Sequence, residues 1–164
     1  MNAEHAKPDL SGQKSDTALP IGMIPNAHID RISGLIEFLH AENTPSDLSE
    51  VATQLVLDID ELLPIWEALI LLDFAVVHEG QIKLTGAGKA FAEGSIDERK
   101  QIFRAQLISQ LPETGKMHNQ IRGGARIKRM LRKRIWRNHE WQAMVDTQRA
   151  TIMEWGRYAE LFDD

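Results

Sequence analysis

Apolar residues recur three and four positions apart in the first half of the chain, and this spacing predicts three consecutive helices. Each series is bounded by proline, asparagine, serine or aspartate, residues that favour turns and helix caps. The predicted helices fall within residues 29–43, 48–55 and 58–72.

Two of these helices carry a recognisable start signal. Asp47 and Glu50 have the spacing of a capping box, in which each side chain accepts a backbone N–H of the other, and Asp58 and Glu61 repeat it. The third helix also contains Pro64. Because proline has no N–H to donate, we expect Pro64 to kink or delay that helix.

Two β-prone runs follow, at residues 74–77 and 81–84, and Gly80 lies in the short turn between them. Thr85 then has the position of a helix cap. Three helices closed by a hairpin is the order of a winged helix. We therefore assign a winged-helix unit to residues 19–93.

The second half of the chain is also predicted to be helical. Ser95 and Glu98 form another capping-box pattern, and Pro112 should end the helix that follows. After a stretch broken at residues 123–124 by two glycines, Asn138 can cap a long helix with a coiled-coil-like stripe. The stripe consists of Trp141, Val145, Gln148, Ile152, Trp155, Ala159 and Phe162.

This pattern predicts a mainly α fold with three parts. Residues 1–18 lack an apolar run and should form a flexible tail, because few side chains can offset their ordering entropy. The winged-helix unit comes next. Residues 94–164 form a helical subdomain that we expect to share one core with it.

Composition narrows the range of functions. Hydrophobic residues make up 43% of the 164 residues, as in ordinary globular proteins. Cysteine is absent, which excludes disulfides, thiolate metal sites and cysteine nucleophiles. The longest apolar stretch is too interrupted to cross a bilayer. We expect a cytoplasmic protein.

Charge is distributed unevenly. The acidic segment, residues 32–82, contains ten Asp and Glu residues and no Lys or Arg. The basic segment, residues 122–137, contains no acid. Its bases are Arg122, Arg126, Lys128, Arg129, Arg132, Lys133, Arg134 and Arg137. This separation predicts a candidate patch for binding a partner or an anion.

No motif for catalysis, cofactor binding or metal binding is found. The string from Gly86 to Lys89 resembles a phosphate loop, but its first glycine is misplaced and Ala90 replaces the magnesium-binding hydroxyl. We interpret its glycines as allowing tight packing after the Thr85 cap. The six histidines show no ligand spacing, and no G-x-S-x-G is present.

A winged helix suggests DNA binding, but the predicted third helix carries acids and no base, which would repel phosphates. The basic segment is the better candidate for nucleic acid or anionic lipid. It also contains Ile127, Met130, Leu131 and Ile135, so an amphipathic helix with a solvated face is the favoured interpretation. It could also pair with the acidic segment or with an acidic partner.

Several strings together resemble a known family. They are W-G-R-Y-A-E-L-F at residues 155–162, D-E-L-L-P-I-W-E-A at 60–68, L-T-G-A-G-K-A-F-A at 84–92 and I-D-E-R-K at 96–100. They resemble the AAA-associated C-terminal domain, which follows the ATP-binding subunit of nitrate, sulfonate and bicarbonate-type ABC importers. The resemblance spans residues 19–162 and departs from the family pattern between residues 112 and 140.

The resemblance implies an accessory domain without ATP hydrolysis of its own, either detached from an ATPase or excised from one. It implies a regulatory or protein-interaction function, with an ABC importer ATPase subunit or a second copy as partner, at the inner face of the membrane. The alternative is a transcription regulator that binds DNA through the basic segment.

The family-motif residues are interpreted as structural. They are Trp155, Gly156, Arg157, Tyr158, Glu160 and Phe162. On the helical stripe, Trp155 and Phe162 should be buried, whereas Arg157 and Glu160 should point elsewhere.

Overall fold

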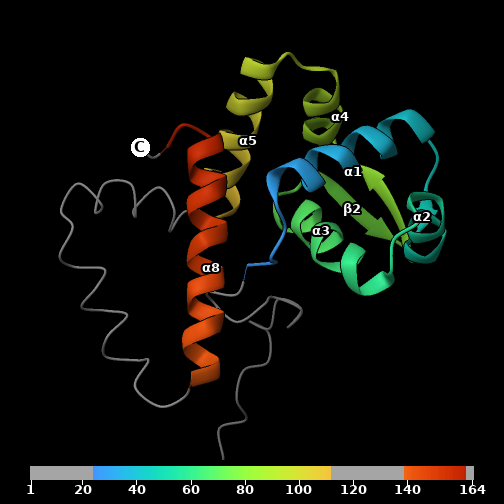
Figure 1. Ribbon diagram of the computed structural model, residues 1–164. Helices are drawn as coiled ribbons and strands as arrows, with labels where there is room; N and C mark the ends of the chain where they lie inside the picture. The colour runs from blue at the N-terminus through green and yellow to red at the C-terminus, as the bar shows by residue number, and fades with distance from the viewer. Residues whose placement is uncertain (1–23, 112–138, 162–164) are drawn as a thin grey trace, which may run out of the picture.

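A computed structural model describes residues 24–111 and 139–161, and for residues 139–145 only the course of the helix is described. It confirms the mainly helical fold class and contains one small antiparallel sheet (Figure 1). The helices are α1 (Ile29–Glu42), α2 (Leu48–Leu55), α3 (Ile59–Leu71), α4 (Gly86–Glu93), α5 (Ile96–Gln110) and α8 (His139–Tyr158). The strands are β1 (Ser46–Asp47), β2 (Ala75–His78) and β3 (Gln81–Leu84).

The starts of α2 and α5 follow the local capping signals. The Glu50 N–H donates to Asp47 Oδ1 at 2.8 Å, and the Asp47 N–H donates to Glu50 Oε2 at 3.2 Å. The same capping box opens α5, where the Ser95 N–H donates to Glu98 Oε2 at 2.7 Å. These side chains satisfy N–H groups that have no partner within the helix.

Pro64 does not delay α3. The helix starts at Ile59 and continues through the proline to Leu71. The N–H that proline lacks would have bonded to the carbonyl of Asp60, four residues earlier. Asp60 is solvent-exposed, so water can satisfy that carbonyl instead.

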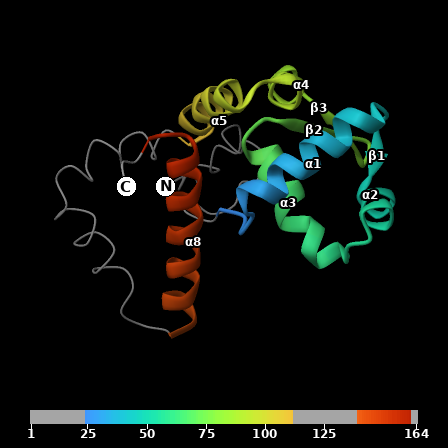
Figure 2. The ribbon, with the colours of Figure 1, turned by 45° about the horizontal axis from the view of Figure 1, so that its top comes forward.

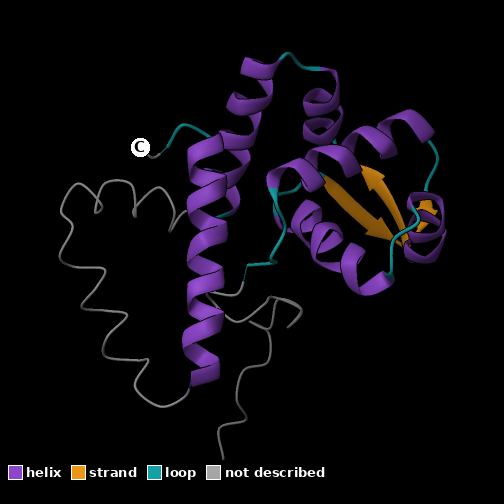
Figure 3. Cartoon of the chain, in the orientation of Figure 1, coloured by secondary structure: helices purple, strands orange, loops and turns teal. Residues whose placement is uncertain are grey.

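The sheet has a third strand that the sequence pattern did not indicate. Its strand order is β1-β3-β2, and its strands are drawn in orange in Figure 3. Ser46 lies opposite Ile82 in the first pair and Ala75 opposite Leu84 in the second. Residues 44–47 were interpreted as a turn and a cap, whereas Asp47 both caps α2 and ends β1. The description of this unit as a winged helix stays a prediction, as does the division of the chain into three parts.

The buried side chains form one cluster that includes residues from α1 through to Leu161. Phe103 of α5 lies at a junction within it. Its ring stacks on Phe74 with 5.8 Å between centroids and meets Trp155 and Tyr158 edge-on at 6.1 and 5.3 Å. The C-terminal turns of α8 therefore pack against α5, on the side of the molecule away from the sheet (Figures 1 and 2).

Candidate interaction surfaces and the C-terminal motif

Within residues 24–111 and the described side chains of α8, no three His, Asp or Glu residues are grouped so that they could hold a metal ion. No helix in the part of the chain that the structure describes is long and apolar enough to span a membrane.

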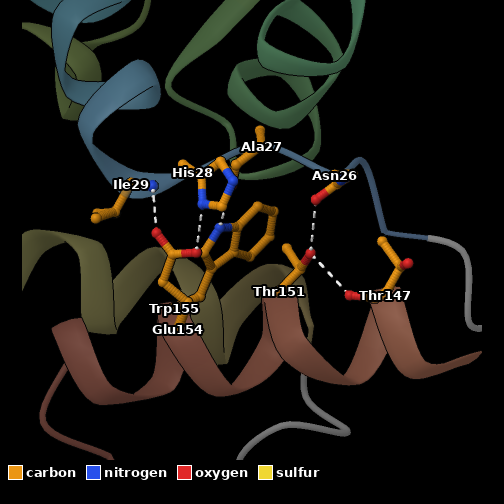
Figure 4. A network of polar contacts seen from close by, with 8 residues as sticks. All are labelled: Asn26, Ala27, His28, Ile29, Thr147, Thr151, Glu154 and Trp155. Carbon is orange, nitrogen blue, oxygen red and sulfur yellow. Dashed lines mark hydrogen bonds and ion pairs between the residues drawn. The ribbon is translucent and has the colours of Figure 1, made fainter.

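Trp155 anchors α8 to the rest of the protein. Its side chain is fully buried, and its indole Nε1 donates to the carbonyl oxygen of Ala27 at 2.9 Å (Figure 4). A buried indole N–H without an acceptor would be costly, so this bond fixes where α8 can lie. The predicted burial of Trp155 is confirmed, whereas Phe162 lies outside the described residues.

Glu154, next to Trp155, caps the start of α1. The N-cap residue His28 makes no side-chain cap bond, and instead the Ile29 N–H donates to Glu154 Oε1 at 2.9 Å. The other oxygen, Oε2, lies 2.9 Å from His28 Nδ1 (Figure 4). A carboxylate at a helix N-terminus is stabilised by the unpaired N–H groups and the helix dipole.

Two further residues of α8 contact the chain before α1, which we call the entry segment (residues 24–28). The Gln148 side-chain amide hydrogen-bonds the backbone N–H and carbonyl of Ile24. The Thr151 hydroxyl lies 3.3 Å from Asn26 Oδ1 and 3.1 Å from the carbonyl oxygen of Thr147. One side of α8 thus holds the entry segment mainly through its backbone.

The end of the motif contacts α5. Lys100 Nζ lies 2.8 Å from Glu160 Oε1, and Arg104 Nη1 donates to the Glu160 carbonyl at 3.4 Å. The hydrogen bond and charge of Lys100 lower the pKa of the Glu160 carboxyl, and Glu160 raises the pKa of Lys100. Burial raises the pKa of Tyr158. Arg157 and Glu160 are exposed as predicted, and Gly156 is buried.

Arg99 is a structural residue that the sequence analysis missed. Its guanidinium lies over the Phe91 ring, 5.5 Å from the centroid, and donates to the carbonyls of Gly94 and Ala92 at 3.1 and 2.8 Å. It also pairs with Glu37 of α1. One side chain thus ties α1, α4 and α5 together. Its place in the string I-D-E-R-K at residues 96–100 marked Arg99 in the sequence, but not which groups it contacts.

The glycine-lysine string opens α4. Thr85 Oγ1 accepts the Gly88 N–H at 3.1 Å, so Thr85 is the predicted cap. A Cβ on Gly88 would lie 2.1 Å from the Phe74 carbonyl oxygen, whereas one on Gly86 would meet nothing within 4 Å. Tight packing therefore explains Gly88 but not Gly86.

The acidic segment presents an exposed side of α3 on which acidic and apolar side chains alternate. Asp60, Leu63 and Ile70 are exposed, and Glu67 is half-buried. No lysine or arginine occurs on this helix. The eight bases of the basic segment all lie outside the described residues, so this patch stays a prediction.

Comparison with known proteins identifies the family. Residues 49–164 match the family described as the C-terminal AAA-associated domain. The match begins later than the resemblance in the sequence analysis, which started at residue 19. No curated protein and no solved structure matched the chain. Because the family match covers well over half of the chain and reaches its last residue, this protein belongs to the family of C-terminal AAA-associated domains.

Proposed function

We propose that the protein is a non-catalytic regulatory domain that binds the ATP-binding subunit of an ABC importer of the nitrate, sulfonate or bicarbonate type. Membership of the C-terminal AAA-associated family carries this proposal, because such a domain is an accessory to an ATPase rather than the ATPase core. The importer class rests on the motif strings, above all W-G-R-Y-A-E-L-F at residues 155–162.

The geometry of the motif supports a structural contribution to this function. Trp155 and Ala159 are buried in the core. On either side of them, Glu154 accepts the Ile29 N–H at the start of α1, and Glu160 binds Lys100 of α5. The motif therefore orders α8 instead of offering reactive groups. Partner contacts would then be made by surfaces that α8 holds in place, at the cytoplasmic face of the transporter.

The acidic character of α3 argues against the alternative of a DNA-binding regulator. Phosphate neutralisation supplies much of the affinity for DNA, and the exposed side of α3 offers Asp60 and Glu67 instead of bases. The basic segment, with eight Lys and Arg residues, is the part of the sequence best suited to phosphate contacts. We therefore keep protein binding as the proposed function, with self-association into a homodimer as the competing protein contact.

Association is tested directly with purified proteins. The chain is titrated by calorimetry into the ATP-binding subunit of such an importer from the same host, and we expect a dissociation constant in the micromolar range or below, about −8 kcal/mol. An ATP-binding subunit of an unrelated importer is the matched control. Equal binding to both subunits, or to neither, would contradict the proposal. Salt-sensitive binding to duplex DNA would favour the alternative.

A further inference from the structure

An apolar stripe along α3 is left uncovered by the elements that the structure describes. Ile59, Leu63 and Ile70 are 48%, 38% and 40% exposed. Their spacing of four and seven positions places them on one side of the helix, with Glu67 between the last two. We call this side the α3 face. Large apolar side chains aligned in this way are typical of a surface that another segment covers.

Val56, the C-cap residue of α2 three positions before α3, exposes another large apolar side chain at an energetic cost. It is 89% exposed and has φ 55° and ψ 45°, the left-handed conformation that a β-branched residue rarely adopts. Because its side chain is exposed, no free energy of hydrophobic burial offsets the strain of that backbone conformation. Backbone strain of this kind persists at functional sites more often than elsewhere.

Acidic side chains surround the apolar stripe. Asp58, Asp60 and Glu61 are exposed at the start of α3, and Glu67 lies within the face. The whole acidic segment lacks Lys and Arg, so no base within it offsets this charge. The surface therefore suits a segment that combines apolar and basic side chains.

The basic segment of the same chain has this chemistry. Between residues 122 and 137 it has eight Lys and Arg residues, no acid, and five interleaved large apolar residues. It follows α5, and Gln106 Nε2 of α5 donates to the Leu72 carbonyl at the end of α3 at 2.9 Å. The ten intervening residues, 112–121, can span at most about 33–36 Å. The thirteen residues of α3 are about 20 Å long, so the segment can reach the whole face.

We propose that the α3 face is the docking surface for the chain's own basic segment, residues 122–137. A tether this short gives an effective concentration on the order of millimolar, which favours the attached segment over a second copy at ordinary protein concentrations. The docking covers the apolar stripe and neutralises the acids around it. It does not depend on the proposed ATPase partner.

Paramagnetic relaxation tests this proposal, because the chain has no cysteine and accepts a single labelling site. With a nitroxide on Ala125→Cys, we expect broadening of the amide signals of α3 and none at Ile96, an exposed apolar residue at the start of α5. In the control, one chain carries the nitroxide but no ¹⁵N, and it is mixed with a second, cysteine-free chain that carries ¹⁵N but no nitroxide. This mixture should show no broadening. Broadening in the mixture would assign the surface to a second copy, and its absence from α3 in both samples would overturn the proposal.

Charge reversal separates docking from a folding defect. Asp60→Lys with Glu67→Lys should abolish the broadening at α3, and adding Arg129→Glu with Arg132→Glu should restore it. The indole signal of buried Trp155 reports whether each variant keeps its fold. Failure of restoration in a variant with an unchanged indole signal would contradict the charge complementarity on which the proposal rests.

Discussion

Val56 and Asn43 have nearly the same backbone conformation but very different side chains. Both follow the last residue of a helix and are left-handed, with φ 55° for Val56 and φ 49° for Asn43. Asparagine tolerates this conformation, and a β-branched side chain does not. The two positions thus offer a matched pair for measuring the strain at Val56.

We expect Val56→Gly to raise the free energy of unfolding by about 1 kcal/mol, because glycine removes the steric cost and the exposed valine loses no burial. Asn43→Val should lower it by a similar amount, about 1–2 kcal/mol. Both are measured by urea denaturation. A destabilised Val56→Gly protein would show that the valine side chain contributes contacts outweighing its strain.

The ion pair between Glu160 and Lys100 should make the stability of the protein depend on pH. Because the pKa of Glu160 is lowered by folding, its stabilising contribution is present above the carboxyl's ordinary pKa and is lost as pH falls through the folded value. In Lys100→Met, the Glu160 carboxyl should titrate at a higher pH, as measured by ¹³C NMR. The pKa of Glu98, which hydrogen bonds from Ser95 hold low, should not change. An unchanged Glu160 titration would rule out Lys100 as the cause.

At the scale of elements, the packing of α4 depends on the close approach of Gly88 to the backbone of Phe74. Gly88→Ala would bring a methyl group against the Phe74 carbonyl, which is backbone and cannot rotate away. We expect a loss of about 1–3 kcal/mol or more in the free energy of unfolding. Gly86→Ala, two residues earlier in the same helix, should be neutral or stabilising by about 0.4–1 kcal/mol. Equal effects of the two substitutions in thermal denaturation would contradict the packing explanation.

The starts of α2 and α5 were predictable because their signals are local, whereas the cap of α1 comes from Glu154 in α8. Asp47 with Glu50, and Ser95 with Glu98, lie three residues apart and form the capping boxes that their spacing indicates. Strand β1 was not predictable. It has two residues, and it forms only because β3, some 35 positions later, offers a free edge. Such a short strand has no pattern of its own.

At the scale of the whole molecule, the attachment of α8 was only half predictable. The stripe on the helix predicted that Trp155 is buried, but not that its indole and Glu154 bond to backbone atoms at Ala27 and Ile29, more than 120 residues away. Backbone acceptors and donors exist at every residue, so sequence cannot identify them. The family match begins at residue 49, yet the entry segment before it is held by α8.

Trp155 should therefore matter to the stability of the whole protein. Trp155→Ala is expected to cost about 3–5 kcal/mol of unfolding free energy, because it removes a large buried side chain. Trp155→Phe keeps an aromatic ring but leaves the Ala27 carbonyl without its donor, so its cost should be smaller and near 1–3 kcal/mol. Chemical denaturation measures both. Unchanged melting with lost association would instead make Trp155 an interface residue.

The regulatory claim is tested most directly by the ATP hydrolysis rate of the importer's ATP-binding subunit. The rate is measured with and without a saturating amount of this chain, with Mg-ATP held constant. The proposed function predicts that the rate changes by at least about twofold, a barrier change near 0.4 kcal/mol, and that the chain alone hydrolyses no ATP. An unchanged rate under conditions where calorimetry shows the complex to be formed would contradict a regulatory function.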